Sequence, residues 1–417
     1  MRCELISIGD ELLIGQTVNT NASWLGEQLS LAGIPVMKVI TIQDEREAIL
    51  NAIEQGFINS DLIIMTGGLG PTQDDITKQV LCEYFETGLV INERVLEQVR
   101  QFFEQRKRPM LEVNRLQAAV PESCIVVENR NGTAPGMWFE RAGKILISLP
   151  GVPYEMKSIM KEGLLDRIAA HFQTSSIYYQ TICTTGIGES FLAERIKDWE
   201  SRVRSEGFGL AYLPSPGLLK LRITSDGGIK DQEKIQLYFK ELEEQYPEYV
   251  FGYGEDTLSE VTGKLLLEHN KTVGTVESCT GGGLGAELVK TAGSSAYFKG
   301  GLITYTNELK HQLAGVKSET LKIYDAVSEE TVKEMAIGGL KVLETDYCIA
   351  TSGFVGPSGG NERYGVGTVW ISVAFGDSCI TRKLNFGSDR ENNIQMSIFA
   401  ALNLLRNVIC ENNIEKK

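Results

Sequence analysis

Along the first third of the chain, short apolar runs alternate with stretches in which apolar residues recur every three or four positions. The short runs predict strands at residues 4–8, 36–42, 61–65 and 144–149. The longer period predicts helices at residues 21–32, 45–57 and about 153–172. Because strands and helices alternate, we expect βαβ units and a parallel sheet covered by helices on both faces.

The pattern changes near residue 175 and returns to its first form near residue 253. In between, it predicts strands at residues 177–184 and 218–224 and helices at 190–203 and 231–246. Beyond, it predicts helices at 258–270, 281–291, 328–343 and from 389, and strands at 272–276, 302–305, 346–351, 367–375 and 378–384. We therefore expect two three-layer α/β domains, at residues 1–172 and 253–417, joined by a small α+β domain at residues 173–252.

The closing helix carries an apolar stripe at helical spacing, formed by Ile394, Ile398, Leu402, Leu405 and Ile409. This stripe predicts a helix that faces a core.

Composition places the chain among soluble globular proteins. Of its 417 residues, 42% are hydrophobic and 23% are charged, which excludes disorder as the main state. The net charge of −14 argues against nucleic acids and anionic membranes as partners, because both require a basic surface. Small phosphate-bearing ligands remain allowed, since backbone N–H groups can hold them locally.

Two further absences in the sequence indicate a cytoplasmic protein. No apolar run approaches the roughly 20 residues that a membrane span requires. The eight cysteines lie far apart without a C-x-x-C pair, which is typical of reduced thiols.

In the last domain, the sequence ESCTGGG at residues 277–283 joins a predicted strand to a predicted helix. Glycines let the backbone approach a ligand, and the free N–H groups of a helix start favour an anion or an oxyanion. A serine at such a turn can act as a nucleophile if a base takes its proton. The alternative is that Ser278 or Thr280 only caps the helix. Cys279 is a rival nucleophile, because a helix start can activate a thiolate.

Few residue types in this chain can serve as the general base for Ser278. The three histidines, His171, His269 and His311, form no ligand-like pair. The sequence therefore gives little support for a Ser-His-Asp triad or a zinc site, both of which use histidine. A lysine or tyrosine would have to activate Ser278, and burial can lower the pKa of a lysine enough for that role.

Five motifs in order resemble the C-terminal domain of the CinA family: ESCTGG at 277–282, AGSSA at 292–296, GLITYTNELK at 301–310, AVSEE at 326–330 and VGTV at 366–369. That domain is a nicotinamide mononucleotide amidohydrolase, which releases ammonia and leaves nicotinate mononucleotide. The resemblance implies that Ser278 is the nucleophile and that Lys310 and Tyr305 handle protons, without a cofactor. It also implies that five residues contact the substrate: Thr280, Gly281, Gly282, Ser295 and Arg390. Among these, Arg390 would bind the phosphate.

One loop departs from the family pattern. The family usually reads GIAGP where this chain reads GFVGP at residues 353–357. We expect the larger side chains of Phe354 and Val355 to line that loop and to narrow or reshape the pocket.

In the first domain, three loops follow predicted parallel strands: GDELLIG at 9–15, TGGLGPTQDD at 66–75 and PGVPYE at 150–155. Open α/β sheets place their ligands at such strand exits. Carboxylates beside glycine-rich loops suggest a hard divalent cation that bridges phosphates. The alternative for Asp75 is that it caps the following helix.

These loops, with NGTAPG at 131–136, resemble the molybdopterin-binding-like domain that forms the N-terminal half of CinA, and TGIGE at 185–189 fits the middle domain. The family links the N-terminal domain to metal-dependent ADP-ribose pyrophosphatase activity. The resemblance implies a Mg²⁺, Mn²⁺ or Co²⁺ ion at Glu11, Asp74 and Asp75. It implies substrate contacts at Gly67, Gly68, Gly70 and Thr72.

The sequence therefore predicts a bifunctional cytoplasmic hydrolase of pyridine-nucleotide turnover that acts on nicotinamide mononucleotide and ADP-ribose and forms a homodimer. The alternative is a non-catalytic nucleotide- or pterin-binding protein whose loop at Phe354 and Val355 has closed the amidase pocket. A DNA-handling role is disfavoured by the acidic charge.

Overall fold

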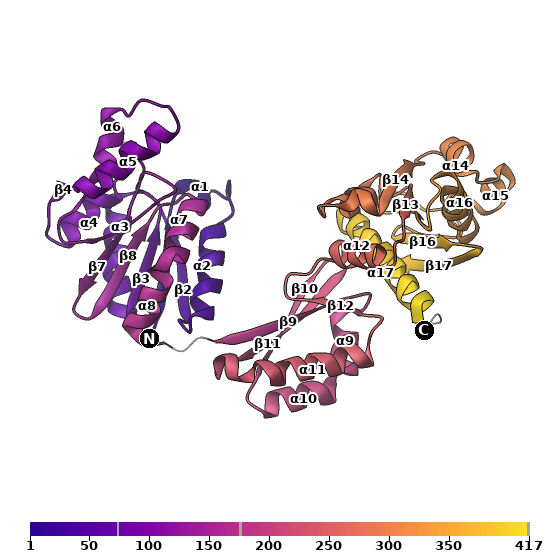
Figure 1. The fold of residues 1–417 in the computed structure, drawn as a ribbon, viewed down its shortest axis with the longest axis horizontal. Coiled ribbons are helices and arrows are strands. Elements are labelled where there is room, and N and C mark those ends of the chain that lie inside the picture. Colours follow the sequence, from indigo (N-terminus) through magenta and orange to yellow (C-terminus); the bar gives the residue numbers. More distant parts are fainter. Residues whose placement is uncertain (73–74, 175–176, 415–417) are drawn as a thin grey trace. The chain divides into compact units, whose positions relative to one another are not determined.

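The computed structural model describes residues 1–72, 75–174 and 177–414, and the chain forms two compact units (Figure 1). Unit 1 comprises Met1–Tyr178 with Asp226–Lys230, and unit 2 comprises Tyr179–Ser225 with Asp231–Lys417. Both units contain sheets with helices packed against them, which confirms the predicted class of α/β domains with a small linking domain.

Unit 1 is built on a six-stranded sheet in the order β2-β1-β3-β8-β7-β6. Its strands are β1 (Cys3–Ile8), β2 (Val36–Ile42), β3 (Leu62–Thr66), β6 (Ile125–Val127), β7 (Gly136–Arg141) and β8 (Lys144–Leu149). The four strands predicted from the sequence run parallel, as expected. The strands β7 and β6 continue the sheet as an antiparallel edge, so the sheet is mixed rather than purely parallel.

Neighbouring residues of the central strands face opposite sides of this sheet. Leu5 and Ile64 belong to a core shared with α2 (Thr20–Leu31), α7 (Pro153–Ile159) and α8 (Leu165–Phe172). Ile6 and Ile63 belong to a second core shared with α3 (Arg46–Asn59) and α4 (Thr77–Tyr84). A strand that is apolar on both faces must be covered on both, which produces the three layers.

The predicted helix at residues 153–172 is interrupted. A wide turn, η2 (Met160–Leu164), separates α7 from α8, and Gly163 has a φ of 110° there. Only glycine adopts that conformation readily, so this residue ends the first helix. The remaining elements of unit 1 are α1 (Asp10–Leu13), β4 (Leu89–Ile91), α5 (Glu93–Gln105), α6 (Glu112–Arg115), η1 (Leu116–Ala118) and β5 (Ala119–Pro121).

Unit 2 begins with a four-stranded sheet in the order β10-β11-β9-β12. The strand β11 buries every second residue, as expected for a sheet with one covered face, and α10 and α11 lie against the sheet (Figure 1). The elements are β9 (Tyr178–Thr185), α9 (Glu189–Arg195), α10 (Lys197–Ser205), β10 (Gly209–Ser215), β11 (Leu218–Ser225), α11 (Gln232–Gln245) and β12 (Val250–Tyr253). The short turn η3 (Gly228–Asp231), between β11 and α11, is grouped mostly with unit 1.

The last sheet has the order β14-β13-β15-β16-β17. Its strands are β13 (Val273–Glu277), β14 (Phe298–Ile303), β15 (Tyr347–Gly353), β16 (Thr368–Phe375) and β17 (Ser378–Asn385). The first three strands of this order are parallel, and β16 and β17 are antiparallel additions at one side.

Helices cover both faces of this sheet. One core contains α12 (Leu258–Glu268), α13 (Gly283–Val289) and α17 (Arg390–Ile414), and the predicted apolar stripe of the closing helix lies in it. The other core contains residues of α14 (Asn307–Ala314) and α16 (Glu329–Val342). The short elements are η4 (Ser294–Ala296) and α15 (Ser318–Tyr324).

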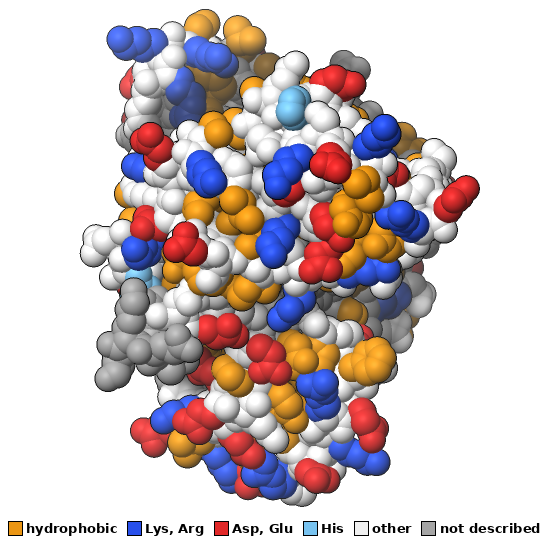
Figure 2. All heavy atoms as spheres, turned by 90° about the vertical axis from the view of Figure 1, so that its right-hand side faces the viewer, with side chains coloured by type: hydrophobic (Ala, Val, Ile, Leu, Met, Phe, Trp, Pro, Cys, Tyr) orange, Lys and Arg blue, Asp and Glu red, His pale blue; other side chains and the backbone are white. Residues whose placement is uncertain are grey.

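Basic and acidic side chains are interspersed on the face drawn in Figure 2, with small apolar areas between them. Among the described helices, none is long and apolar enough to cross a membrane.

Candidate functional sites

The carboxyl ends of three parallel strands bring the distant motifs of the last domain to one edge of its sheet. Ser278 follows β13, Thr304 follows β14, and Gly353 ends β15. Because β14 and β15 flank β13 in parallel register, the loops after all three strands lie together.

The start of α13 is held by a residue that the motif analysis passed over. The carboxylate of Glu277, at the end of β13, is buried and accepts hydrogen bonds from the Thr280 hydroxyl at 2.7 Å and from the N–H groups of Gly282, Leu284 and Gly285 at 2.8–3.0 Å. A carboxylate at a helix start is favoured by the helix dipole. Glu277 thus takes the capping role, and Ser278 is not needed as a cap.

Ser278 is paired with Lys310. The Lys310 ammonium donates to the Ser278 Oγ at 3.0 Å, and it also donates to the backbone oxygens of Thr304 at 2.9 Å and Tyr305 at 3.4 Å. Lys310 is 1% exposed and Ser278 is 8% exposed. The first turn of α14 presents the lysine, and the Thr306 hydroxyl caps that turn by accepting from the Leu309 N–H.

Burial changes the acid–base chemistry of this pair. Removal from water lowers the pKa of Lys310, and the neighbouring groups Cys279, Asp325 and Glu308 act in the opposite direction. A lower pKa increases the fraction of neutral amine at a given pH, as a general base requires.

Cys279 does not have the properties of a nucleophile. Its side chain is 5% exposed, and burial raises the pKa of the thiol to about 12. The thiolate is the reactive form, so the thiol beside Ser278 is inert near neutral pH.

The turn leaves fewer N–H groups for an oxyanion than its glycines suggest. The N–H of Gly281 donates to the Ser278 oxygen, and the N–H of Gly282 donates to Glu277. Among the described residues, the N–H groups of Cys279 and Thr280 donate to no other residue. The Thr280 hydroxyl is engaged with Glu277 and lies 2.8 Å from the Thr351 hydroxyl.

Arg390 contacts Tyr305 at the same edge of the sheet. The Arg390 guanidinium donates to the Tyr305 hydroxyl at 3.2 Å and to the Gly356 oxygen at 2.9 Å. Tyr305 is 58% exposed, so its hydroxyl lies with Arg390 at the surface and not in the buried contact of Ser278 with Lys310. Ser295 is exposed on η4, and among the described residues no hydrogen bond joins it to Ser278 or Lys310.

Of the two large side chains in the GFVGP loop, Phe354 is placed as expected and Val355 is not. Val355 is buried in the core that contains α17, so its side chain does not line the loop. Phe354 is half-buried and packs against the other core, and its ring lies beside the loop, since a Cβ on Gly359 would be 3.5 Å from it.

In unit 1, the predicted loops also meet at one sheet edge, because β1, β3 and β8 are parallel neighbours. A Cβ placed on Gly67 would lie 2.3 Å from the Ile8 oxygen, and one on Gly151 would lie 3.3 Å from the Gly67 Cα. Glycine is therefore required where the loops approach each other.

Asp75 organises its own loop. Its carboxylate accepts from the Gly70 N–H at 2.7 Å and from the N–H of Thr72 at 3.0 Å, and the Thr72 hydroxyl donates to it as well. The N-cap position of α4 is Ile76, so the alternative role of Asp75 as a helix cap is not observed.

The three residues expected to bind the metal differ in how free their carboxylates are to do so. Glu11 is exposed in the short helix α1, and carboxylate oxygens are the ligands that Mg²⁺ and Mn²⁺ prefer. Both oxygens of Asp75 are already used by loop donors. Asp74 lies outside the described residues. Within residues 1–72, 75–174 and 177–414, no group of three or more His, Cys, Asp or Glu side chains forms a metal cluster.

Three further side chains lie at this edge and were not predicted from the sequence as ligands, although Glu155 stands in one of the predicted loops. A Cβ on Gly68 would lie 2.0 Å from the Thr77 Oγ1 and 3.2 Å from the Asp44 Oδ2. The Thr77 hydroxyl is buried and has no partner among the described residues. Glu155 is buried beside Gly132, accepts from the Asn129 amide at 2.6 Å, and has its pKa raised by burial.

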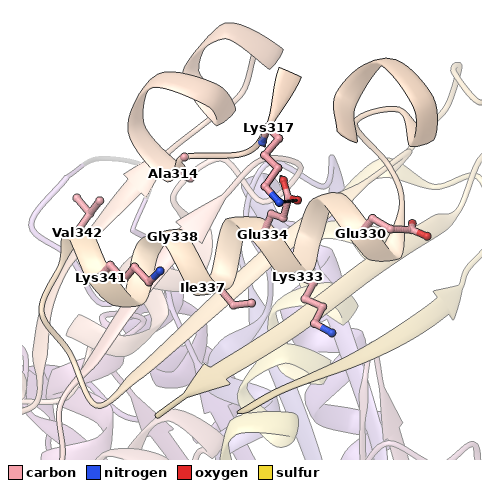
Figure 3. Close-up of a pocket in the computed structure, with 10 residues that line it drawn as sticks. Ala314, Lys317, Glu330, Lys333, Glu334, Ile337, Gly338, Lys341 and Val342 are labelled. Atoms are coloured by element: carbon pink, nitrogen blue, oxygen red, sulfur yellow. Dashed lines mark hydrogen bonds and ion pairs between the residues drawn. The ribbon is translucent and has the colours of Figure 1, made fainter. Parts of the chain in front are cut away.

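A surface groove of about 670 Å³ lies apart from these residues, along α16 and the end of α14 (Figure 3). Lys317 and Glu334, which line it, form an ion pair at 3.9 Å. None of the predicted site residues lines this groove, so size alone does not identify the functional site.

Comparisons with known proteins match the chain from end to end. Family models match as a "probable molybdopterin binding domain" at residues 4–170, a "damage-inducible protein CinA KH domain" at 179–252 and a "CinA C-terminal domain" at 255–409. A CinA-like protein of Cytophaga hutchinsonii is 44% identical and covers 98% of each chain. Another CinA-like protein, of Flavobacterium psychrophilum, is 41% identical over 99% of each chain. The solved structure of CinA from Thermoplasma acidophilum is 35% identical, covers 40% of this chain and 96% of its own, and has a TM-score of 0.37.

Proposed function

Because this chain belongs to the CinA family, we propose that its last domain hydrolyses nicotinamide mononucleotide to nicotinate mononucleotide and ammonia. The observation that carries the proposal is the 3.0 Å hydrogen bond between the buried Lys310 and Ser278. Amide hydrolysis needs a nucleophile and a base that can later protonate the leaving amine, and this pair supplies both.

In the proposed reaction, neutral Lys310 takes the proton of the Ser278 hydroxyl as the Oγ attacks the carboxamide carbon. The oxyanion that forms faces the N–H groups of Cys279 and Thr280, which donate to no other described residue. The tetrahedral intermediate collapses, its C–N bond breaks, and Lys310 returns the proton to the nitrogen, which leaves as ammonia. Water then attacks the ester of Ser278 while the same amine takes its proton. The C–Oγ bond breaks, Lys310 returns the proton to the Ser278 Oγ, and nicotinate mononucleotide is released.

The exposed Arg390 is the proposed contact of the substrate phosphate. A guanidinium matches phosphate in geometry and charge. The hydroxyl of Tyr305 and the Gly356 oxygen hold it at the sheet edge. This arrangement supports a positioning role for Tyr305 in addition to the proton handling that the family implies.

The decisive experiment is ammonia release from nicotinamide mononucleotide by the purified full chain. We expect turnover by the wild-type protein and none above background by Ser278→Ala, with circular dichroism unchanged. Ser318→Ala, which removes an exposed hydroxyl at the start of α15, is the matched control and keeps full activity. Ammonia release that survives Ser278→Ala would refute the nucleophile, and tight binding without turnover would favour a non-catalytic binding protein.

For the first domain, we propose a metal-dependent cleavage of the ADP-ribose diphosphate. Glycine-rich loops at the exits of three parallel strands and the exposed carboxylate of Glu11 support this proposal. Glu11 and Asp74 would hold the divalent cation, which would neutralise the diphosphate, while Asp75 shapes the loop around it. We expect cleavage with Mg²⁺ or Mn²⁺ and its loss in Asp74→Ala. Equal cleavage in the presence of a chelator would exclude the metal.

A further inference from the structure

One residue beside the Ser278 site has a backbone conformation that is normally reserved for glycine. Asp325, directly after α15, has φ 71° and ψ 171°. The other non-glycine residues with positive φ in the described chain have values of 49–53°, in the ordinary left-handed region. Residues other than glycine rarely adopt the backbone conformation of Asp325. A residue in such a conformation persists where surrounding contacts hold it there.

The contacts of Asp325 are specific. One carboxylate oxygen accepts from the Ala326 N–H at 2.6 Å, and the other accepts from the Asn361 amide at 2.7 Å. Its backbone oxygen accepts from the hydroxyls of Ser328 and Thr331 at the start of α16. The strained residue is therefore fixed from both its side chain and its backbone.

This turn reaches both ends of the glycine-rich loop at residues 353–360. Before the loop, the Ser352 hydroxyl donates to the Ala326 oxygen at 2.7 Å, and the adjacent Thr351 oxygen accepts from the Ser278 N–H at 3.0 Å. After the loop, Asn361 is bound by the Asp325 carboxylate. Between these ends, the Gly356 oxygen accepts from Arg390.

We propose that Asp325 is a positioning residue of the Ser278 site, which clamps the far end of the glycine-rich loop through Asn361 and so holds the Gly356 oxygen in place for Arg390. The inference deepens the proposed amidase function and rests on it. Asp325 would act on substrate affinity through the loop, without touching the substrate itself.

The carboxylate also belongs to the electrostatic surroundings of Lys310. The titratable groups that face this lysine are Cys279 after β13, Glu308 on α14 and Asp325 from the turn before α16, and the effect of Asp325 on the pKa of Lys310 exceeds that of Glu308. Removing the negative charge of Asp325 would lower the pKa of Lys310 further. The clamp and the charge can therefore be separated by experiment.

The test uses the full chain with Asp325→Gly, Asn361→Ala and the double variant. Glycine adopts the observed backbone conformation without strain, so Asp325→Gly removes the carboxylate while the turn is kept. We expect each single variant to raise KM for nicotinamide mononucleotide about tenfold with a smaller change in kcat, because a charge-assisted hydrogen bond is lost. The double variant should raise KM by less than the product of the two single effects, since both variants break the contact between Asp325 and Asn361. It need not equal either single variant, because the Asn361 side chain also accepts from the N–H groups of Arg363 and Tyr364.

Glu308→Gln and Asp325→Asn separate charge from clamping. Both should move the acidic limb of the kcat/KM profile to lower pH, the second by more. Glu308→Gln should leave KM unchanged, because no hydrogen bond among the described residues joins its side chain to the loop. Asp325→Asn should also raise KM, because an amide keeps only one of the two oxygens that accept from Ala326 and Asn361.

Hydrogen exchange of residues 353–360 gives a readout without substrate, and it should be faster in Asp325→Gly and Asn361→Ala. Residues 363 and 364 are left out of this readout, because the Asn361 side chain accepts from their N–H groups directly.

Unchanged loop exchange together with wild-type KM in Asp325→Gly would overturn the inference, as would additive effects in the double variant. If the wild-type protein releases no ammonia, the proposed function fails, and the exchange measurement alone decides whether Asp325 clamps the loop. If Asp325→Gly does not fold, the same exchange and KM measurements on Asn361→Ala decide between these outcomes.

Discussion

The Lys310 ammonium donates to the Ser278 hydroxyl at 3.0 Å, although the two residues are 32 positions apart and lie on different elements. Both side chains are almost fully buried. The contact joins the exit of β13 to the first turn of α14, so the packing of α14 against the sheet sets its geometry. Several measurable consequences depend on this arrangement.

Lys310 should control the pH dependence of ammonia release. As a base it must be neutral, so kcat/KM falls as the pH drops through its pKa, with a midpoint below the ordinary value of 10.5 because burial lowers the pKa. Lys310→Arg should lose about 10²–10⁴-fold in kcat/KM at every pH, because a guanidinium stays protonated. The measurement is the pH profile of the wild type and the variant. Lys299→Arg, an exposed change on β14, is the control, and a wild-type profile in Lys310→Arg would contradict the role of the base.

Cys279→Ala should retain ammonia release within a few-fold of the wild type. The thiol is buried with a pKa of about 12, so it contributes packing and no thiolate. Treatment of the wild type with iodoacetamide at pH 7 should leave Cys279 unmodified, as checked by peptide mass spectrometry. A loss of activity equal to that of Ser278→Ala would instead make the cysteine the nucleophile.

Arg390→Ala should impair the hydrolysis of nicotinamide mononucleotide more than the hydrolysis of the corresponding riboside. If the guanidinium binds the phosphate, KM for nicotinamide mononucleotide rises about 10–100-fold, since a charge-assisted hydrogen bond is worth about 1.5–3 kcal/mol. The riboside lacks the phosphate, so its weaker turnover should change little. Arg382→Ala, on the exposed part of β17, is the matched control. Equal losses for both substrates would show that Arg390 acts only through Gly356 and Tyr305.

Asp75→Asn should lower ADP-ribose cleavage without changing the metal concentration that gives half-maximal activity. The reason is that Asp75 binds the N–H groups of Gly70 and Thr72, which shapes the loop. Asp74→Ala, in contrast, should abolish the metal response. The measurement is a Mg²⁺ titration, with Asp166→Asn on the exposed side of α8 as the control. If Asp75→Asn needs a much higher Mg²⁺ concentration for half-maximal activity, Asp75 is a metal ligand after all.

Two glycine-to-alanine changes in helices should shift stability in opposite directions. A Cβ on Gly338 in α16 would lie 1.6 Å from the Ala314 oxygen, so Gly338→Ala forces apart α16 and the helix that carries Lys310, at about 1–3 kcal/mol. Gly26 in α2 has open space, so Gly26→Ala should stabilise by about 0.5–1 kcal/mol. Scanning calorimetry of the full chain measures both. Ammonia release should fall only in Gly338→Ala, and shifts of the same sign in both variants would contradict the packing argument.

The local pattern was sufficient for the central elements but not for the edges of the sheets. The parallel strands of unit 1 are continuous apolar runs, and such runs are recognisable from sequence. The hairpin of β6 and β7 was missed, since β6 has only three residues and little periodicity. The helix α14 was missed for the same reason, because eight residues provide little more than two turns.

Apart from the roles of Ser278 and Lys310, which the family resemblance implied, side-chain roles that depend on a distant partner were not read from the motifs. The carboxylate of Glu277 caps α13 across several residues, and Asp75 turns back to Gly70 instead of capping α4. Val355 was expected at the pocket and lies in the core, because the loop places it towards α17. The motifs identified the region of each site, and only the folded chain shows which atoms meet.

By itself, the sequence of this protein determined its α/β class, the order of its motifs and the position of Ser278 at the end of a strand. These properties depend on hydrophobic period and on immediate chain neighbours. The resemblance of its motifs implied Lys310 as the partner of Ser278. The tertiary structure decided the direct contact of these two side chains, the burial that lowers the pKa of the amine, and the burial that keeps Cys279 a thiol. It also decided that Asp325 reaches Asn361 across the site. Desolvation and contacts between distant residues arise only when the helices pack on the sheet, so no local pattern could encode them.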